Sequence, residues 1–138
     1  AAVERAVAVA KERGAKRAVT LPVSAPFHCR LMAPAAETME QALSDTAIAA
    51  PGPPVVSNVT AEPETDPDAI RQRLVEQVTR TVRWRESVRT MQERGVDTLV
   101  ELGHGNTLSG LARRIDRSLA SRAVGGPQQI DELLESLS

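Results

Sequence analysis

The chain has very few aromatic side chains. Of its 138 residues, one is Trp, one is Phe and none is Tyr, although 41% of the residues are hydrophobic. The core must therefore consist mainly of Ala, Val, Leu and Ile, each of which stabilises the fold by only about 1.5–3 kcal/mol when fully buried. We expect such a core to be completed by parts that this sequence does not contain.

The chain also has little cysteine, little net charge and no long apolar run. A single cysteine, Cys29, excludes an internal disulfide framework and fits a reducing compartment. No stretch of about 20 apolar residues is present that could cross a membrane, and nothing resembles a signal peptide. A formal net charge of −1 gives no general attraction to nucleic acid or to an anionic membrane. We expect a soluble, cytoplasmic protein that binds neither.

Apolar spacing and turn residues predict short strands that alternate with helices. Strands are expected at 17–23 and 98–102, the second of them buried, and a brief extended run is expected at 55–59. Helices are expected at 1–13, from Pro34, from Pro67, from Trp84 to Gly95, over 108–119 and after Pro127. This alternation is typical of an α/β architecture.

A proline-flanked loop, 24–32, presents a histidine after the first expected strand. Imidazole is suited to proton transfer because its unperturbed pKa, about 6.5, lies near neutral pH. From the pattern alone, a hydrogen-bonded or capping role for His28 is the commoner explanation. Cys29 is no evidence of a Cys–His pair, since adjacent side chains of an extended loop usually diverge. His28 and His104 with one cysteine fit no standard zinc spacing, so no metal is expected.

Several segments add specificity because they occur in a particular order. They are LPVSAPFHCRLM at 21–32, PVVSNV at 54–59, LVEQ at 74–77, VRW at 82–84, ELG at 101–103 and LSGL at 108–111. Together they resemble the carboxyl-terminal portion of the bacterial malonyl-CoA:acyl carrier protein transacylases of type II fatty acid synthesis. The resemblance extends to about residue 119, apart from His104, where the family usually has Pro in a Gly-x-Gly turn.

The resemblance implies a fold and an activity. Residues 24–138 would be the carboxyl-terminal part of an acyltransferase core of the α/β-hydrolase-like kind. Residues 1–23 would be the last helix and strand of a ferredoxin-like small subdomain. The family moves a malonyl group from CoA to the phosphopantetheine thiol of acyl carrier protein through a Ser–His dyad, and the CoA thioester is a substrate rather than a cofactor. The implied partners are malonyl-CoA and acyl carrier protein, and we expect the complete enzyme to be a monomer.

The resemblance also implies roles for four residues. His28 would be the catalytic general acid/base, oriented by the main-chain carbonyl of Gln77 in place of a carboxylate. Phe27 and Asn58 would lie at the substrate. A Phe before the catalytic His accompanies malonyl rather than methylmalonyl use in related polyketide acyltransferases, and one methyl group provides about 1–3 kcal/mol of discrimination. Phe27 as a core side chain and Asn58 as an Asx turn remain alternatives.

The nucleophile of the dyad is missing from the sequence. No G-x-S-x-G pattern occurs, and Ser109 lies in an expected helix without the flanking glycines. We therefore expect the isolated chain to be inactive. An acyltransferase domain of a polyketide or fatty acid synthase remains an alternative, as does a non-catalytic carrier-protein-binding module.

The middle of the chain is locally rich in arginine. These residues indicate either solvated helix faces or a docking surface for an acidic carrier protein, as the resemblance implies. They are Arg71, Arg73, Arg80, Arg83, Arg85, Arg89 and Arg94.

Overall fold

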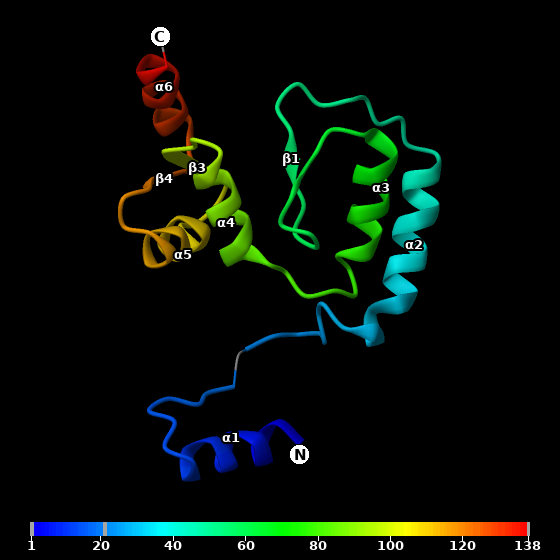
Figure 1. Ribbon diagram of the computed structural model, residues 1–138, viewed down its shortest axis with the longest axis vertical. Coiled ribbons are helices and arrows are strands. Elements are labelled where there is room, and N and C mark those ends of the chain that lie inside the picture. The colour runs from blue at the N-terminus through cyan, green and yellow to red at the C-terminus, as the bar shows by residue number, and fades with distance from the viewer. Residues whose placement is uncertain (1, 21, 138) are drawn as a thin grey trace.

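The computed structural model describes residues 2–20 and 22–137 and has the expected mixture of helices and strands (Figure 1). Its helices are α1 (Ala2–Glu12), α2 (Ala33–Ser44), α3 (Pro67–Glu76), α4 (Trp84–Glu93), α5 (Thr107–Ile115) and α6 (Pro127–Ser136), and a 3-10 turn at Arg30–Met32 leads into α2. Its strands are β1 (Val55–Val56), β2 (Pro63–Glu64), β3 (Thr98–Leu102) and β4 (Ala120–Val124).

The described strands form two small sheets. The strands β1 and β2 pair antiparallel, whereas β3 and β4 pair parallel, with Thr98 opposite Ala120 and Leu102 opposite Val124. Because parallel neighbours need a crossover, α5 connects β3 to β4 in a β-α-β unit. The helices α5 and α6 both contact β4, and α4 packs against α5.

The elements gather in two groups, with α1 set apart from both (Figure 1). One group contains α2, α3 and the β1–β2 ribbon, and α2 packs along α3. The other contains α4, β3, α5, β4 and α6. The segment between α3 and α4 links the two groups, so residues near the end of α3 lie at the junction.

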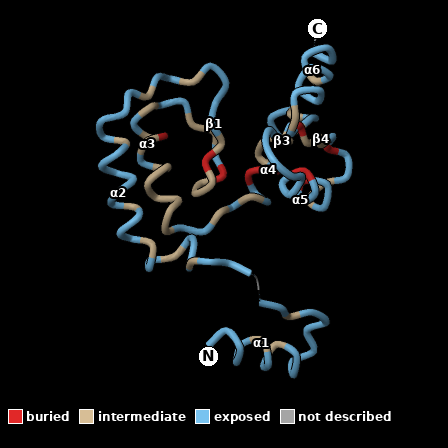
Figure 2. Tube along the Cα trace, turned by 180° about the vertical axis from the view of Figure 1, so that it is seen from behind, coloured by how far each residue is buried: buried red, intermediate tan, exposed pale blue. Residues whose placement is uncertain are grey.

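The core of the second group is small. Val88 and Ala112 are fully buried and Leu119 is 4% exposed. Partly buried side chains surround these three, namely Trp84, Met91, Leu99 and Ile115. Figure 2 shows how few positions of the chain are buried. The scarcity of large aromatic side chains therefore corresponds to a limited core.

Helix boundaries follow local chemistry. Asp66 caps α3 by accepting a hydrogen bond from the Ala69 N–H at 2.8 Å, and Pro67 occupies the first turn. Gly95 follows α4 with a φ of 89°, and Gly14 follows α1 with a φ of 86°. These left-handed conformations suit glycine, which carries no Cβ. The predicted starts or stops of all three helices are confirmed.

The strand predicted at 17–23 is wrong, since residues 17–20, 22 and 23 adopt no strand conformation; Leu21 lies outside the described residues. Val19 is 59% exposed and Val23 64% exposed. A strand forms only where a neighbour satisfies its N–H and C=O groups, and the described chain offers this segment no strand partner.

Three further expectations need correction. The helix expected over 108–119 ends at Ile115, because Asp116 takes an extended conformation with φ −145° and ψ 126°. The strand β4 follows directly and was not predicted. The segment expected at 55–59 forms a strand only at Val55–Val56. The strand β3 has the predicted bounds but alternates between exposed and half-buried residues, so among the described residues it is not buried.

Candidate active-site histidine

His28 occupies a strained position in the loop that follows the α1 segment. Its φ is 59°, in the left-handed region that few residues other than glycine adopt. The preceding residue closes a tight turn, in which the Phe27 N–H donates to the Ala25 carbonyl at 2.9 Å. Strained backbone of this kind costs about 1–3 kcal/mol and gathers at functional sites. Among the described non-glycine residues, His28 shares this conformation with Ala61, whose φ is 60°, so the backbone marks both positions.

The imidazole of His28 contacts the end of α3. Its Nδ1 lies 2.9 Å from the main-chain oxygen of Gln77, which is 49 residues away in the chain. Because a carbonyl oxygen can only accept, Nδ1 must carry the proton and donate it. In the neutral ring Nε2 then has a free lone pair. His28 as a whole is exposed in the described chain.

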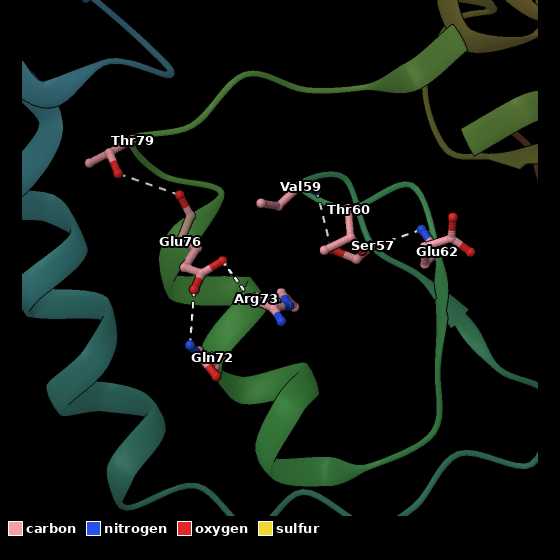
Figure 3. A network of polar contacts seen from close by, with 8 residues as sticks. All are labelled: Ser57, Val59, Thr60, Glu62, Gln72, Arg73, Glu76 and Thr79. Carbon is pink, nitrogen blue, oxygen red and sulfur yellow. Dashed lines mark hydrogen bonds and ion pairs between the residues drawn. The ribbon is translucent and has the colours of Figure 1, made fainter. Parts of the chain in front are cut away.

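Gln77 presents its carbonyl because it lies at the carboxyl terminus of α3. The last carbonyls of a helix have no partner within the helix, whereas the Gln77 N–H still donates to the Arg73 carbonyl at 3.0 Å. Figure 3 shows the polar contacts that hold this end of α3. The Glu76 carboxylate accepts from Arg73 at 2.8 Å and from Gln72 at 3.0 Å. The hydrogen bond from Arg73 lowers the pKa of the Glu76 carboxyl below its usual value of 4.5.

Asn58 lies next to Gln77, in the turn that follows β1. Its Nδ2 donates to the side-chain Oε1 of Gln77 at 3.0 Å. Asn58 also borders two cavities. One, of about 190 Å³, includes Gln77 and Leu74 in its lining, and the other, of about 280 Å³, includes Trp84 and Ser109. Neither cavity is lined by His28. The structure therefore joins His28, Gln77 and Asn58 into one series of contacts.

Phe27 and Cys29 flank the histidine in different ways. Phe27 is 55% exposed, so it is not part of the core that the described chain forms. The Cys29 thiol donates to the Pro26 carbonyl at 3.1 Å, a contact within the loop itself. Phe27 is therefore an exposed neighbour of His28, whereas the Cys29 thiol is bound within the loop.

Ser109 has a structural setting unlike that of a nucleophile. It is 5% exposed and lies in α5. Its N–H and that of Leu108 donate to the Glu101 carboxylate at 2.8 and 3.0 Å. These hydrogen bonds, that from Ser109 first, lower the pKa of the Glu101 carboxyl. Sequence reasoning missed this role of Glu101, although an acidic residue just before a Gly-rich turn into a helix was a usable signal.

Within residues 2–20 and 22–137, no group of three or more His, Cys, Asp or Glu side chains converges as a metal site. None of the helices in the described part of the chain has the length and apolar character needed to span a bilayer.

A neutral imidazole that donates through Nδ1 to a main-chain carbonyl keeps Nε2 as a proton acceptor, which is the arrangement that a general base requires. Comparison with solved structures agrees with an acyltransferase fold. An acyl-carrier-protein-S-malonyltransferase from Bartonella henselae is 50% identical, with a TM-score of 0.90 over 99% of this chain and 43% of its own. A type II polyketide malonyl-transacylase, solved with its acyl carrier protein, gives a TM-score of 0.87 at 43% identity, over 98% of this chain and 44% of its own.

Sequence comparison gives the family. The malonyl CoA-acyl carrier protein transacylase of Escherichia coli K12 is 46% identical over 134 residues, which are 97% of this chain and 43% of that protein. The transacylase of Bacillus subtilis is 42% identical over 135 residues, 98% of this chain and 43% of that protein. No family model matches the chain. The chain belongs with the malonyl CoA-acyl carrier protein transacylases and corresponds to a carboxyl-terminal portion of them, spanning under half of their length.

Proposed function

We propose that this chain supplies the general acid/base histidine for transfer of a malonyl group from CoA to the phosphopantetheine thiol of an acyl carrier protein. The observation that carries the proposal is the His28–Gln77 contact, which commits Nδ1 and leaves Nε2 free. The substrates are inferred from the malonyl CoA-acyl carrier protein transacylases that resemble this chain. Those proteins are more than twice as long as this chain. We further propose that residues 1–23, of which only helix α1 is formed in the described chain, belong to a ferredoxin-like small subdomain of the complete protein.

The chemistry needs a serine from outside this sequence. As that hydroxyl attacks the malonyl thioester, Nε2 of His28 accepts its proton. When the C–S bond breaks, the imidazolium returns the proton to the CoA thiolate. The carrier-protein thiol then attacks the malonyl ester, Nε2 takes the thiol proton, and the departing serine oxygen receives it. The Gln77 carbonyl stabilises the imidazolium in both halves of the reaction.

The isolated chain is accordingly inactive in this proposal. Incubation with radiolabelled malonyl-CoA should leave the protein unlabelled after denaturation and gel electrophoresis. Because Ser109 is buried and its N–H is bound by Glu101, a Ser109→Ala variant should behave identically. A malonyl ester that stays on the chain, and above all one that disappears in Ser109→Ala, contradicts the proposal.

Phe27 is the candidate selectivity residue for malonyl over methylmalonyl groups. Phe27 directly precedes His28, and it is exposed in the described chain. A rigid ring beside the base would occupy the space that an α-methyl group requires. In an active protein that contains this chain, Phe27→Ala should raise methylmalonyl use relative to malonyl use by about 10-fold to 100-fold, the range expected for one methyl group. An unchanged ratio would remove Phe27 from the substrate site.

Carrier-protein docking is proposed for the exposed arginines near α4. Three arginines, Arg85, Arg89 and Arg114, line an open hollow with one acidic residue, Glu86, and with apolar side chains such as Leu111. This excess of positive charge suits an acidic partner with some apolar surface. In contrast, Arg71 donates to the Thr46 carbonyl and Arg83 to the Thr60 carbonyl, whereas Arg73 pairs with Glu76. These three arginines therefore have structural roles.

The docking surface can be tested with Arg89→Glu, which should weaken transfer to the carrier protein more than hydrolysis of malonyl-CoA. Equal losses in both reactions would exclude docking there.

A polyketide acyltransferase is the second candidate. The polyketide biosynthesis protein ThaF of Burkholderia thailandensis is 41% identical over 112 residues, which are 80% of this chain and 10% of that protein. The two candidates can be distinguished with a hybrid protein in which the unmatched amino-terminal part of the Escherichia coli transacylase is joined to this chain. Its malonyl transfer to a carrier protein of fatty acid synthesis is compared with transfer to one of polyketide synthesis. A non-catalytic binding module is the third, and it predicts that replacing His28 has no effect on turnover in such a hybrid.

A further inference from the structure

Asn58 is held in place by its own main chain. The Arg83 N–H, at the start of α4, donates to the Asn58 carbonyl at 2.9 Å. The turn itself is closed by the Ala61 N–H, which donates to the Ser57 carbonyl at 2.8 Å. The Val59 N–H also donates to the Ser57 hydroxyl at 3.2 Å, a contact drawn in Figure 3. Ala61 is 2% exposed and has a φ of 60°. The main chain at Asn58 is therefore held in one position by hydrogen bonds to α4 and within the turn.

Gln77, in contrast, lies where a helix ends and would ordinarily fray. Terminal residues of a helix lack part of the hydrogen bonding that holds the interior. The direction of the Gln77 carbonyl depends on its own backbone angles, φ −62° and ψ −22°. The Asn58 amide, 19 residues away, holds the Gln77 side chain at 3.0 Å. The side-chain bond is partly buried, whereas the His28 contact is exposed and open to competition from water.

We propose that Asn58 is a positioning residue: by holding the side chain of Gln77, it aims the Gln77 carbonyl at Nδ1 and so keeps His28 in the tautomer whose Nε2 is free. The amide of Asn58 thus acts on the reaction through Gln77 and not by contact with substrate. The catalytic importance of Asn58 rests on the proposed function, but its effect on the tautomer of His28 does not. An experiment can therefore contradict one of these two claims and leave the other intact.

The sharpest test is the tautomer ratio of neutral His28, measured by long-range ¹H–¹⁵N correlation NMR of this chain at a pH above the imidazole titration. The unsubstituted chain should show mainly the Nδ1–H form. Asn58→Ala should lower the ratio of Nδ1–H to Nε2–H by about 3-fold or more, since a hydrogen bond of ordinary strength is lost. Gln77→Ala removes the same side-chain bond while leaving the carbonyl in place, and it should give the same shift.

A conservative variant and two controls sharpen the result. Asn58→Asp should keep the original ratio, because rotation of the Gln77 amide lets its Nε2 donate to the new carboxylate. Gln72→Ala removes an exposed side-chain bond to Glu76 from the same helix and should change nothing at His28. His104, in the Gly103–Gly105 turn, is an internal reference whose signals should be the same in every variant.

If Asn58→Ala and Gln77→Ala both fold and both keep the ratio of the unsubstituted chain, the proposal is overturned and Asn58 has a merely structural role. If Asn58→Ala fails to fold, Gln77→Ala decides alone. A shift that Asn58→Asp does not reverse also counts against the proposed hydrogen bond. A ratio that depends on Asn58, in a protein later found not to transfer malonyl groups, would leave the positioning role intact and refute only the proposed function.

Discussion

Replacing Val88 with Ala tests whether the small core around α4 holds the second group of elements together. Val88 is fully buried between Ala112 and Leu119. The substitution removes the equivalent of two methylene groups, about 0.8 kcal/mol each. The cavity that remains adds to this loss because the surroundings relax only partially. We expect a loss of about 2–3 kcal/mol in the free energy of unfolding.

The same loss can be read as a melting temperature. An unfolding entropy of about 2.1 cal/mol/K for each residue of a chain this long converts 2–3 kcal/mol to a decrease of about 7–10 °C. Urea unfolding followed by circular dichroism, with the melting curve as a second probe, measures both. Val3→Ala is the matched control, because Val3 is 63% exposed on α1 and its replacement should change the free energy by less than about 0.5 kcal/mol.

A Val88→Ala chain whose free energy of unfolding lies within about 0.5 kcal/mol of the unsubstituted chain's would show that burial of Val88 does not stabilise this group. That outcome would mean that the contacts of α4 with α5 and Leu119 do not determine stability. Equal losses in Val88→Ala and Val3→Ala would contradict the prediction too, since burial would then not distinguish the two sites.

Three further predictions concern single residues. The pKa of Asp116 is lowered from 3.8 to about 2, mainly by the Ser118 hydroxyl and then by Gln92. Because the folded-state pKa is depressed, the stabilisation that the Asp116 carboxylate provides is complete above pH 3.8 and is lost as the pH falls towards 2. The urea midpoints of Asp116→Asn and of the unsubstituted chain should therefore converge over this pH interval. His28→Gly should be more stable than His28→Ala by about 1 kcal/mol in urea unfolding, because glycine adopts the positive φ without strain; equal stabilities would argue against the strained conformation. Glu101→Ala should speed hydrogen exchange of the first α5 amides selectively, and unchanged rates there would exclude the cap.

Helix limits were predictable because their causes are local. Asp66 and Pro67 are adjacent in sequence to the helix they start, and Gly95 follows the helix that it ends. The strand β4 has no such local signal. Its sequence, Ala-Ser-Arg-Ala-Val, has one β-branched residue, and only the parallel register with β3 makes it a strand. The segment 17–23 failed for the opposite reason, since local β-propensity without a partner strand is insufficient.

The candidate site was only partly accessible from the sequence. The residues alone marked His28 as a loop histidine, and the expectation that Gln77 faces it came from the resemblance, because nothing local connects positions 49 residues apart. The bond between the side chains of Asn58 and Gln77 was not foreseen, as it depends on how the β1 turn meets the end of α3. The left-handed conformation of His28 also required the structure, since few non-glycine residues adopt it, although His does so more often than most.

The most direct test of the central claim is a hybrid protein. The amino-terminal part of the Escherichia coli transacylase that this chain does not match would be joined to the chain, and malonyl transfer from CoA to acyl carrier protein measured. If His28 is the general acid/base, the hybrid is active, and its kcat falls by about 10²-fold to 10⁴-fold in His28→Ala, the contribution typical of such a group. The kcat should be unchanged in His104→Ala. A His28→Ala hybrid that transfers malonyl groups as fast as its parent would contradict this role of His28.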